Sequence, residues 1–296
     1  MIAINLMDSL LRGLRSECRV IFVGDVDQLP SVGPGNVLRD MIESGEIPTV
    51  RLNQIHRQGD NSFISMNAQA INHGKDITVC HEKGSDFWFL PEENAENIPG
   101  IIEKAIRRIP SEFDFAINDI QVLCPQKKGP IGTQAMNTVL RDVFNKDGEE
   151  IPLCGGYRKY DRVIQIKNNY KLGVFNGEIG EVSGEGKDRD TVEVMFDSGG
   201  IEPRVIVYSK PTLMEQTALA YALSIHKYQG SETPCVIIPV HATNFIMLTR
   251  GLIYTGITRG KKLVILVGMK KALGIAIHTV SAVSRNTTLC SLLQGG

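Results

Sequence analysis

Four short apolar runs, each followed at once by a polar or turn-forming tip, constrain the fold of this chain more than any other feature. They are Val20–Val23, Ile120–Cys124, Cys235–Val240 and Leu263–Val267. A strand without regular alternation of apolar and polar residues is typical of a sheet that is buried on both faces, as in parallel sheets covered by helices. The runs therefore predict an α/β fold built on a parallel sheet.

Helical patterns lie between these runs. Apolar residues recur at helical spacing over residues 98–109 and 136–144, and a further stripe runs from Ile2 through Leu6 and Leu10 to Leu14. Strands that alternate with helices predict a doubly wound sheet with helices on both faces.

Residues 157–209 break this rhythm. They hold short strand-like runs separated by hairpin-type turns at Asn176-Gly177 and at residues 197–200. We expect a small all-β barrel inserted into the α/β domain. The chain is then predicted to resume as a helix from Met214 to Ile225.

The composition limits which cellular environment and which classes of partner we expect for this chain. The 296 residues carry a formal net charge of −1, so a nucleic-acid surface has to be a local concentration of Lys and Arg. The six cysteines lie far apart without a C-x-x-C pair, which predicts no metal site and a reducing, cytoplasmic compartment. No apolar run approaches the roughly 20 residues that span a bilayer, so we expect a soluble protein without a membrane partner.

The tip of the first apolar run, Gly24 to Pro30, is a candidate ligand site. In an open α/β sheet, ligands bind beyond the carboxyl ends of the strands. Asp25, Asp27 and Gln28 would then face a bound phosphate or its metal and water. A polar turn that merely closes the strand explains this short segment equally well.

The longer string from Gly24 to Leu38 decides between these interpretations. It resembles motif III of superfamily 1 DNA helicases, and its residues 32–38 look like the RecD-like branch. The resemblance continues at 52–58, at 122–137, at 219–232, which is similar to motif V, and at 252–262, which is similar to motif VI. One departure is Tyr228, where the family usually has Ser.

This resemblance implies a RecA-like parallel sheet flanked by helices, with the barrel inserted in the second of two motor domains. Residues 1–50 would be the end of the first motor domain and 51–156 the first part of the second. The inserted barrel would cover 157–210, and 211–296 would hold the rest of the second motor domain and the tail.

The resemblance also implies roles for single residues. Gln28 would sense the γ-phosphate of ATP, and Arg57 and Arg259 would act as arginine fingers. A planar guanidinium suits this task because it meets phosphate oxygens in a bidentate manner. Outside these motifs, an arginine is usually a solvated surface charge or a helix cap.

Further residues of the motifs would contact the ligands. Gly24, Asp25, Gly230 and Glu232 would lie at the nucleotide, with Gly230 allowing close backbone approach. His226 and Lys227 would lie near nucleotide or DNA phosphates. The alternative for these two is an ordinary helix end, where cations complement the carbonyl dipole.

The stretch Tyr157–Lys171 combines cations with aromatic rings. Arg158, Lys159 and Tyr160 are among its first members, and such a combination suits phosphates and stacked bases of single-stranded DNA. A barrel edge kept soluble by lysines looks similar in sequence.

The sequence contains no Gly-Lys-Ser/Thr loop to cradle phosphates, and no Asp-Glu pair to hold Mg²⁺. We therefore expect the C-terminal half of an ATP-dependent 5′–3′ helicase of recombination or repair. ATP and Mg²⁺ would serve the intact protein, and this chain alone would not hydrolyse ATP. Its partners would be single-stranded DNA, the missing N-terminal motor domain and other subunits of a recombination nuclease complex. The alternative is a non-catalytic DNA-binding or scaffold module derived from a helicase.

Overall fold

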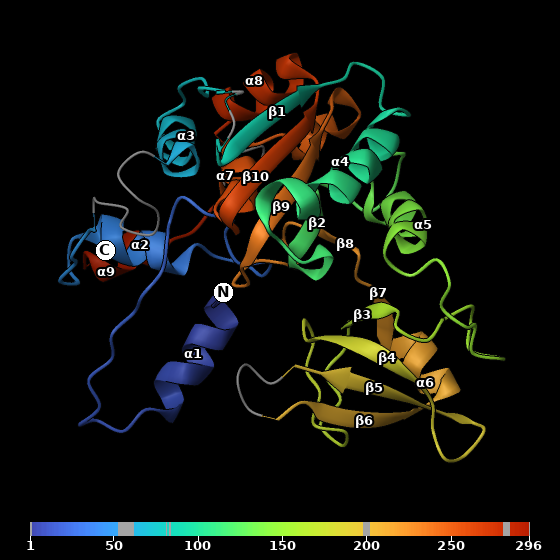
Figure 1. The fold of residues 1–296 in the computed structure, drawn as a ribbon. Helices are drawn as coiled ribbons and strands as arrows, with labels where there is room; N and C mark the ends of the chain where they lie inside the picture. Colours follow the sequence, from blue (N-terminus) through green and yellow to red (C-terminus); the bar gives the residue numbers. More distant parts are fainter. Residues whose placement is uncertain are drawn as a thin grey trace.

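The computed structural model describes residues 2–52, 62–80, 82, 84–197, 202–280 and 285–295. Two sheets organise most of these residues (Figure 1), a parallel sheet in the upper half of the view and an antiparallel sheet at lower right. A smaller N-terminal segment, residues 2–52, lies to the left and contains no strand. The predicted α/β class with an all-β insertion is confirmed.

The parallel sheet contains five strands in the order β1-β10-β9-β2-β8. Their bounds are Phe87–Pro91 for β1, Gly260–Gly268 for β10, Thr233–Val240 for β9, Ile120–Cys124 for β2 and Ala222–Ser224 for β8. Every neighbouring pair is parallel. Three of the four predicted apolar runs are therefore strands of one sheet, and their carboxyl ends meet at one edge.

Helices cover both faces of this sheet. Helices α4 (Ile98–Phe113) and α5 (Thr133–Phe144) lie on one face, as predicted from their apolar stripes, and α3 (Phe63–Asn72), α7 (Arg250–Ile257) and α8 (Lys270–His278) lie on the other. Short 3₁₀ turns, η1 (Ile117–Asp119) and η2 (Ala242–Met247), precede β2 and α7.

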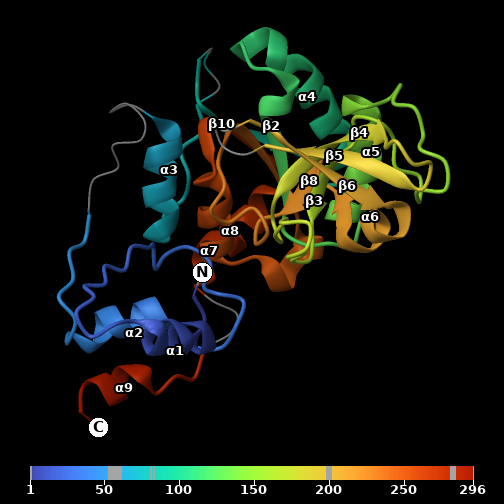
Figure 2. The same ribbon diagram turned by 90° about the horizontal axis from the view of Figure 1, so that it is seen from below.

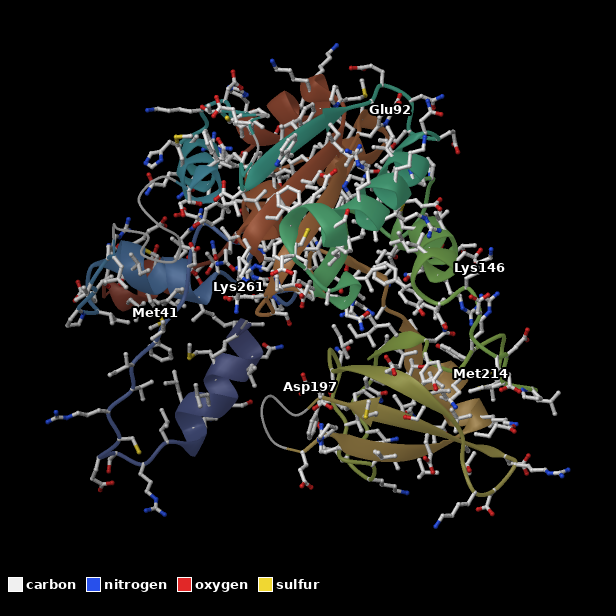
Figure 3. All side chains as sticks on the ribbon, viewed as in Figure 1. Met41, Glu92, Lys146, Asp197, Met214 and Lys261 are labelled. Atoms are coloured by element: carbon white, nitrogen blue, oxygen red, sulfur yellow. The ribbon has the colours of Figure 1, made fainter. Side chains whose placement is uncertain are left out.

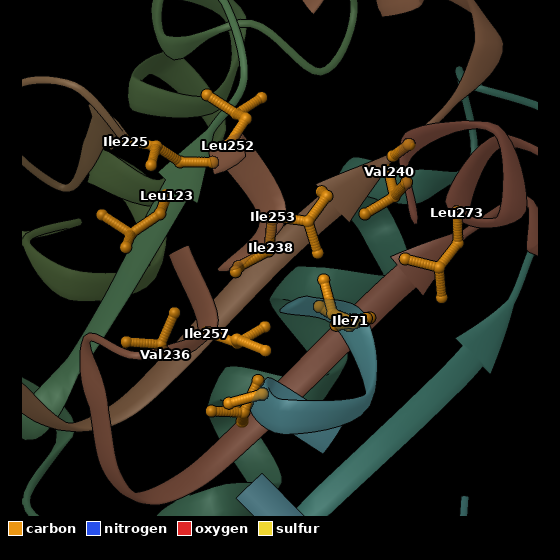
Figure 4. Close-up of a cluster of buried hydrophobic side chains, with 14 of the residues drawn as sticks. Ile71, Leu123, Ile225, Val236, Ile238, Val240, Leu252, Ile253, Ile257 and Leu273 are labelled. Atoms are coloured by element: carbon orange, nitrogen blue, oxygen red, sulfur yellow. The ribbon is translucent and has the colours of Figure 1, made fainter. Parts of the chain in front are cut away.

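Strand β9 shows why these strands lack a polar face. Successive side chains point to opposite sides of a strand, so Ile237 enters the core under α4 and α5 while Ile238 enters the core under α7. Both side chains are fully buried. Figure 4 shows the second core, where Ile238 lies near Ile253 and Ile257 of α7.

The insertion is an antiparallel sheet in the order β6-β5-β4-β3-β7. The bounds are Arg204–Ser209 for β6, Thr191–Phe196 for β5, Ile179–Glu185 for β4, Arg162–Gln165 for β3 and Thr217–Leu219 for β7. Helix α6 (Lys210–Gln216) joins the two edge strands, and the sheet buries its own apolar core around Val182, Val194 and Phe196. The fifth strand lies beyond residue 210.

The predicted helix from Met214 to Ile225 is wrong. Helix α6 ends at Gln216, and the chain then forms two short strands, β7 against β3 and β8 against β2. A short apolar run does not reveal by periodicity whether it is a helix or a strand. Here two open strand edges, one in each sheet, pair with the run and carry the chain from one sheet to the other.

The N-terminal segment forms helices α1 (Ile4–Gly13) and α2 (Val37–Ser44), and the C-terminal helix α9 (Leu289–Leu293) lies beside α2 (Figure 2). The buried residues of the N-terminal segment form a small cluster of Met7, Val37 and Met41. The predicted N-terminal helix is confirmed as α1. Its apolar stripe, however, is largely open to solvent, with Leu6 56% exposed.

The predicted strand Val20–Val23 is also wrong. These residues form no strand, and Ile21 and Val23 are 86% and 93% exposed. A strand needs a neighbour to pair with its backbone N–H and C=O groups. All strands of the described residues come from residue 87 onward, and none of them reaches this run.

Candidate functional site

The loop Gly24–Pro30 is held in shape by one of its own aspartates, Asp25. The Asp25 carboxylate accepts a hydrogen bond from the backbone N–H of Asp27 at 2.9 Å and another from Nε2 of Gln28 at 3.0 Å. A short polar side chain that bonds the backbone two residues on is the usual means of fixing a turn. The amide of Gln28 is thereby oriented by Asp25.

The same loop is bound to helix α7, more than 200 residues further along the chain. The hydroxyl of Tyr254 donates to Oδ2 of Asp25 at 3.0 Å, and the backbone N–H of Leu29 donates to Oγ1 of Thr255 at 2.8 Å. Burial, followed by the negative charge of Asp25, raises the pKa of Tyr254, so this hydroxyl stays protonated and donates.

Two further segments of the parallel-sheet domain, the turn after β8 and the end of α3, also contact the loop. Nε2 of Gln229 donates to the carbonyl of Leu29 at 2.7 Å, and Nδ2 of Asn72 donates to the Asp27 carboxylate at 2.7 Å. Loop 24–30 is therefore connected to α3, to α7 and to the turn after β8. Sequence reasoning named neither Gln229 nor Asn72 as a partner of this loop.

Arg259 follows the end of α7 and is 5% exposed. Its Nε donates to the carbonyl of Thr255 at 3.1 Å, and its terminal nitrogens donate to the carbonyl of Ser231 at 3.3 Å and to Oγ1 of Thr258 at 3.1 Å. Two carbonyl oxygens and one hydroxyl oxygen therefore accept hydrogen bonds from the guanidinium. Thr255 connects it to the loop, because its carbonyl accepts from Arg259 while its hydroxyl accepts from Leu29. The other predicted finger, Arg57, lies outside the described residues.

Gly230 and Glu232 lie between β8 and β9. Gly230 has φ +92°, a conformation that strongly favours glycine and leaves its backbone accessible. Glu232 forms an ion pair with Lys261 at 3.2 Å, across the starts of β9 and β10. A carboxylate in this position already has one cationic partner.

A cavity of about 940 Å³ brings several of these residues together. Four of the seven predicted nucleotide-binding residues line it, namely Gly24, Asp25, Gln28 and Gly230. Three arginines also line it, Arg39, Arg250 and Arg285. Glu232 and Arg259 are not among its lining residues. The predicted set is therefore split between this cavity and the buried end of α7.

His226 and Lys227 occupy the turn that follows β8. Because β8 and β2 are parallel neighbours, with Cys124 opposite Ser224, the loops after both strands meet at one edge. Burial lowers the pKa of His226. Burial and the charge of Lys127 lower the pKa of Lys227. Sequence reasoning missed Lys127, although it is part of the polar tip of a predicted strand.

The predicted DNA-binding residues of the insertion differ in their surroundings. Nη1 of Arg158 lies 3.3 Å from the Asp142 carboxylate and also contacts the carbonyl of Asn145. The ammonium of Lys159 lies 5.0 Å from the centre of the Tyr160 ring. Tyr160 is 55% exposed, with φ +70°. Arg158 is therefore engaged with the end of α5, whereas Lys159 and Tyr160 form a cation and ring on the surface.

A buried carboxylate joins the insertion to the parallel-sheet domain. Asp161 is fully buried and pairs with the guanidinium of Arg141 on α5, and it also accepts from Tyr221 at 3.0 Å and from Asn145 at 2.9 Å. Lys146, just past α5, and Met214 on α6 mark the two sides of this junction in Figure 3. A buried charge with this many donors fixes how the two units meet.

Within the described ranges, neither a cluster of metal-binding side chains nor a membrane-spanning helix occurs. No group of three or more His, Cys, Asp or Glu side chains among them could hold a metal ion. No described helix is long and apolar enough to cross a membrane.

Three family models match parts of the chain. Residues 1–85 match an AAA domain, 136–196 match the SH3 domain of ATP-dependent RecD-like DNA helicases, and 219–267 match the C-terminal domain of UvrD-like helicases.

Curated relatives match over almost the whole chain. The ATP-dependent RecD2 DNA helicase of Deinococcus radiodurans is 30% identical over 290 residues, which are 98% of this chain and 38% of that protein. The RecBCD enzyme subunit RecD of Mycolicibacterium smegmatis is 28% identical and aligns with 94% of this chain and 50% of its own length. The chain thus spans half or less of these two relatives. Among solved structures, Bacteroides Pif1 bound to ssDNA is 16% identical with a TM-score of 0.43, over 73% of this chain and 51% of that one.

Proposed function

This chain belongs to the RecD-like helicases, and from that membership we propose that it is the C-terminal portion of an ATP-dependent DNA helicase. The intact protein would move 5′ to 3′ along single-stranded DNA during recombination or repair. It would act in the cytoplasm, where thiols such as its six free cysteines stay reduced.

The attachment of loop 24–30 to α7 carries this proposal. Motif III, with the candidate γ-phosphate sensor Gln28, is hydrogen-bonded to the helix that leads into the candidate finger Arg259. A motor needs such a connection, because a change at the phosphate must alter the contact between two domains. A scaffold has no physical need to keep it.

In this proposal the described residues would serve the γ-phosphate end of a nucleotide, and the supporting observation is that Gln28 and Gly230 line one cavity. ATP with Mg²⁺ supplies a phosphoryl group whose charge is spread over several oxygens during transfer. Gln28 would donate its amide N–H to one of these oxygens, and the backbone at Gly230 would approach the ligand closely. Arg259 would have to exchange its carbonyl partners for phosphate oxygens. Arg57 is proposed as the second finger.

The carboxyl edge of β2 and β8 is the proposed contact for the DNA backbone. His226, Lys227 and Lys127 meet there, and the lowered pKa of Lys227 reflects burial beside a second cation. A phosphate would supply a neutralising charge. Lys159 and Tyr160 would add a cation and a ring on the insertion, with Arg158 beside them.

The N-terminal segment exposes apolar residues, which supports the proposal that it packs against the rest of a first motor domain. Leu6, Ile21 and Val23 offer apolar surface that a larger sheet would bury. We also propose the following domain division. The end of the first motor domain covers residues 1–50, the second motor domain covers 51–156 and 211–296, and the insertion covers 157–210. By analogy with the relatives named RecBCD enzyme subunit RecD, further subunits of a nuclease complex are proposed partners.

ATP hydrolysis and DNA binding test the proposal together. The isolated 296-residue chain should bind labelled single-stranded DNA and should not hydrolyse ATP above background. Joined to an upstream segment with a Gly-Lys-Thr loop, it should hydrolyse ATP in a DNA-dependent manner. Arg259→Ala should abolish that activity, while Arg107→Ala, on the exposed face of α4, leaves it intact. Robust hydrolysis by the isolated chain, lost on Arg259→Ala, would contradict the proposal.

The alternative is a scaffold or DNA-binding module without catalysis. It predicts that the joined protein binds DNA but stays inactive towards ATP, and that its upstream sequence holds no phosphate-binding loop. Reading the genomic sequence upstream of residue 1 separates the two at little cost.

A further inference from the structure

The C-terminal tail, residues 285–295, lies against the N-terminal segment, although helix α8, the element before it in the chain, belongs to the parallel-sheet domain. Helix α8 packs on the parallel sheet through Ala272, Leu273 and Ala276. The tail, in contrast, lies against loop 31–35 and α2 (Figure 2). Its contacts therefore connect two regions that are far apart in the sequence.

Arg285 makes the most specific of these contacts. One terminal nitrogen donates to the carbonyls of Gly33 at 2.8 Å and Gly35 at 2.7 Å, and the other donates to the carbonyl of Ser31 at 2.6 Å. Three carbonyls of one turn thus converge on one guanidinium. Hydrogen bonds from a charged donor are stronger than neutral ones, and the planar fork of arginine satisfies several acceptors at once.

The turn is shaped for this contact. Gly35 has φ +84°, which an ordinary residue rarely adopts, and a Cβ at Gly33 would lie only 2.5 Å from the Cβ of Ala3. The loop therefore passes close to the start of α1 with its carbonyls turned towards Arg285.

The rest of the tail binds α2. Oγ1 of Thr287 donates at 2.8 Å to the carboxylate of Asp40, which is 3% exposed, and Nε2 of Gln294 donates to the carbonyl of Ser44 at 3.1 Å. Leu289 and Leu293 of α9 pack on the apolar cluster of Met7, Val37 and Met41. The tail thus supplies the hydrogen-bond donor to the buried Asp40 carboxylate, and two of its leucines cover the apolar cluster.

We propose that residues 285–295 form a strap that holds loop 31–35 and α2 in place, with Arg285 as its main anchor. The strap acts with the contacts of loop 24–30 to α7, and the two attachments together restrict how far the N-terminal segment separates from the parallel-sheet domain. This role needs no nucleotide. Only its consequence for a motor, a limit on the opening between two domains, rests on the proposed function.

Hydrogen–deuterium exchange on the 296-residue chain tests the strap. Arg285→Ala should speed exchange of the amides of residues 31–44 by about tenfold or more, because their local opening no longer breaks these bonds. Thr287→Val, nearly equal in shape, should speed exchange in 37–44 severalfold. Amides of β9 and β10 should be unchanged in both variants. Arg107→Ala, which removes an exposed arginine paired with Glu103, should change none of these rates.

Exchange in residues 31–44 that stays within about twofold of the parent chain in both variants would overturn the strap. If Arg285→Ala also speeds exchange in β9 and β10, the variant loosens the whole chain. The exchange rates of Thr287→Val then decide whether the strap exists. Because no step uses ATP or DNA, a chain that fails as a helicase portion can still pass this test, and the reverse also holds.

Discussion

Two apolar runs of similar sequence, Val20–Val23 and Leu263–Val267, adopt different structures. The second forms the centre of β10, with all five side chains buried between helices. The first forms no strand, and Ile21 and Val23 stand open to solvent. Both are short runs of β-branched and other apolar residues, so intrinsic preference does not separate them.

The difference lies in the neighbours. Strand β10 has β1 on one side and β9 on the other, which satisfy its backbone, while helices cover its faces. No described strand pairs with residues 20–23. A strand is therefore a property of a sheet, and the N-terminal segment, residues 2–52, should contribute far less to stability than the parallel-sheet domain.

The largest contrast is expected between two ion pairs. Asp161→Ala leaves Arg141 with its charge largely buried and removes the acceptor of Tyr221, which should cost about 3–5 kcal/mol in free energy of unfolding. Asp8→Ala on α1 breaks an exposed pair with Arg12 and should cost at most about 0.5 kcal/mol. Urea denaturation measures both. A cost below about 1 kcal/mol for Asp161→Ala would show that this junction does not hold the insertion.

Apolar truncations sharpen the same contrast. Ile237→Ala in β9 should cost about 2–5 kcal/mol, because it opens a cavity in a fully packed core. Ile21→Ala removes the same atoms from solvent-exposed surface and should stay within about 0.5 kcal/mol. Thermal and urea unfolding of the two variants provide the comparison. Equal losses would mean that residues 20–23 are buried in solution.

Charges at the carboxyl edge should matter more for DNA than those of the N-terminal segment. Replacing Lys127 and Lys227 with Ala should reduce the salt dependence of single-strand binding by about 0.7 for each phosphate that is no longer neutralised. Replacing Arg15 and Arg19, which are exposed close to residues 20–23, should leave it unchanged. Fluorescence anisotropy over a range of salt concentrations measures the slope. The proposed edge is refuted if both double variants behave alike.

The insertion provides a second comparison for DNA binding. If the insertion is part of the DNA contact surface, charge reversal at Arg158 and Lys159 should weaken single-strand binding. It should also lower the salt dependence of that binding. Because Arg158 is already engaged by Asp142, most of the change should come from Lys159. Single variants assayed by the same titration separate the two. An unchanged affinity and slope would remove the insertion from the proposed contact surface.

The smallest effect is a dependence on pH. Burial lowers the pKa of His226, so the folded chain binds this proton less readily than the unfolded chain. The stability linked to His226 is therefore present above about pH 6.5, the unperturbed value, and is lost as the pH falls towards the folded pKa. Replacing His226 with Gln should flatten the pH dependence of stability below that value. Urea denaturation of both chains at a series of pH values measures this, and two profiles of equal slope would contradict it.

The sequence alone named part of the set of residues that line the cavity, because motifs are local. Gly24, Asp25, Gln28 and Gly230 were named from sequence, and they line one cavity although about 200 residues separate the first from the last. Tyr254, Thr255 and Gln229 lay within the segments that resemble helicase motifs, but their partners in loop 24–30 did not follow from any pattern. A hydrogen bond between residues far apart in the chain leaves no periodic signal.

The misplaced elements have a common cause. Residues 20–23 and the apolar stretch 218–223 are both short, and what each becomes depends on whether a strand edge is open beside it. The apolar stripes over residues 98–109 and 136–144 correctly predict helices, which the structure shows as α4 and α5. A helix satisfies its own backbone and shows its buried face at a spacing of 3.6 residues.

The sequence by itself determined the α/β class, the all-β insertion and the family, because apolar period and motif spacing are written along the chain. Only the tertiary structure decided which runs become strands, where Arg259 points and how the tail reaches loop 31–35. Those outcomes depend on pairings between distant segments, and their free energy arises only when both partners are folded together.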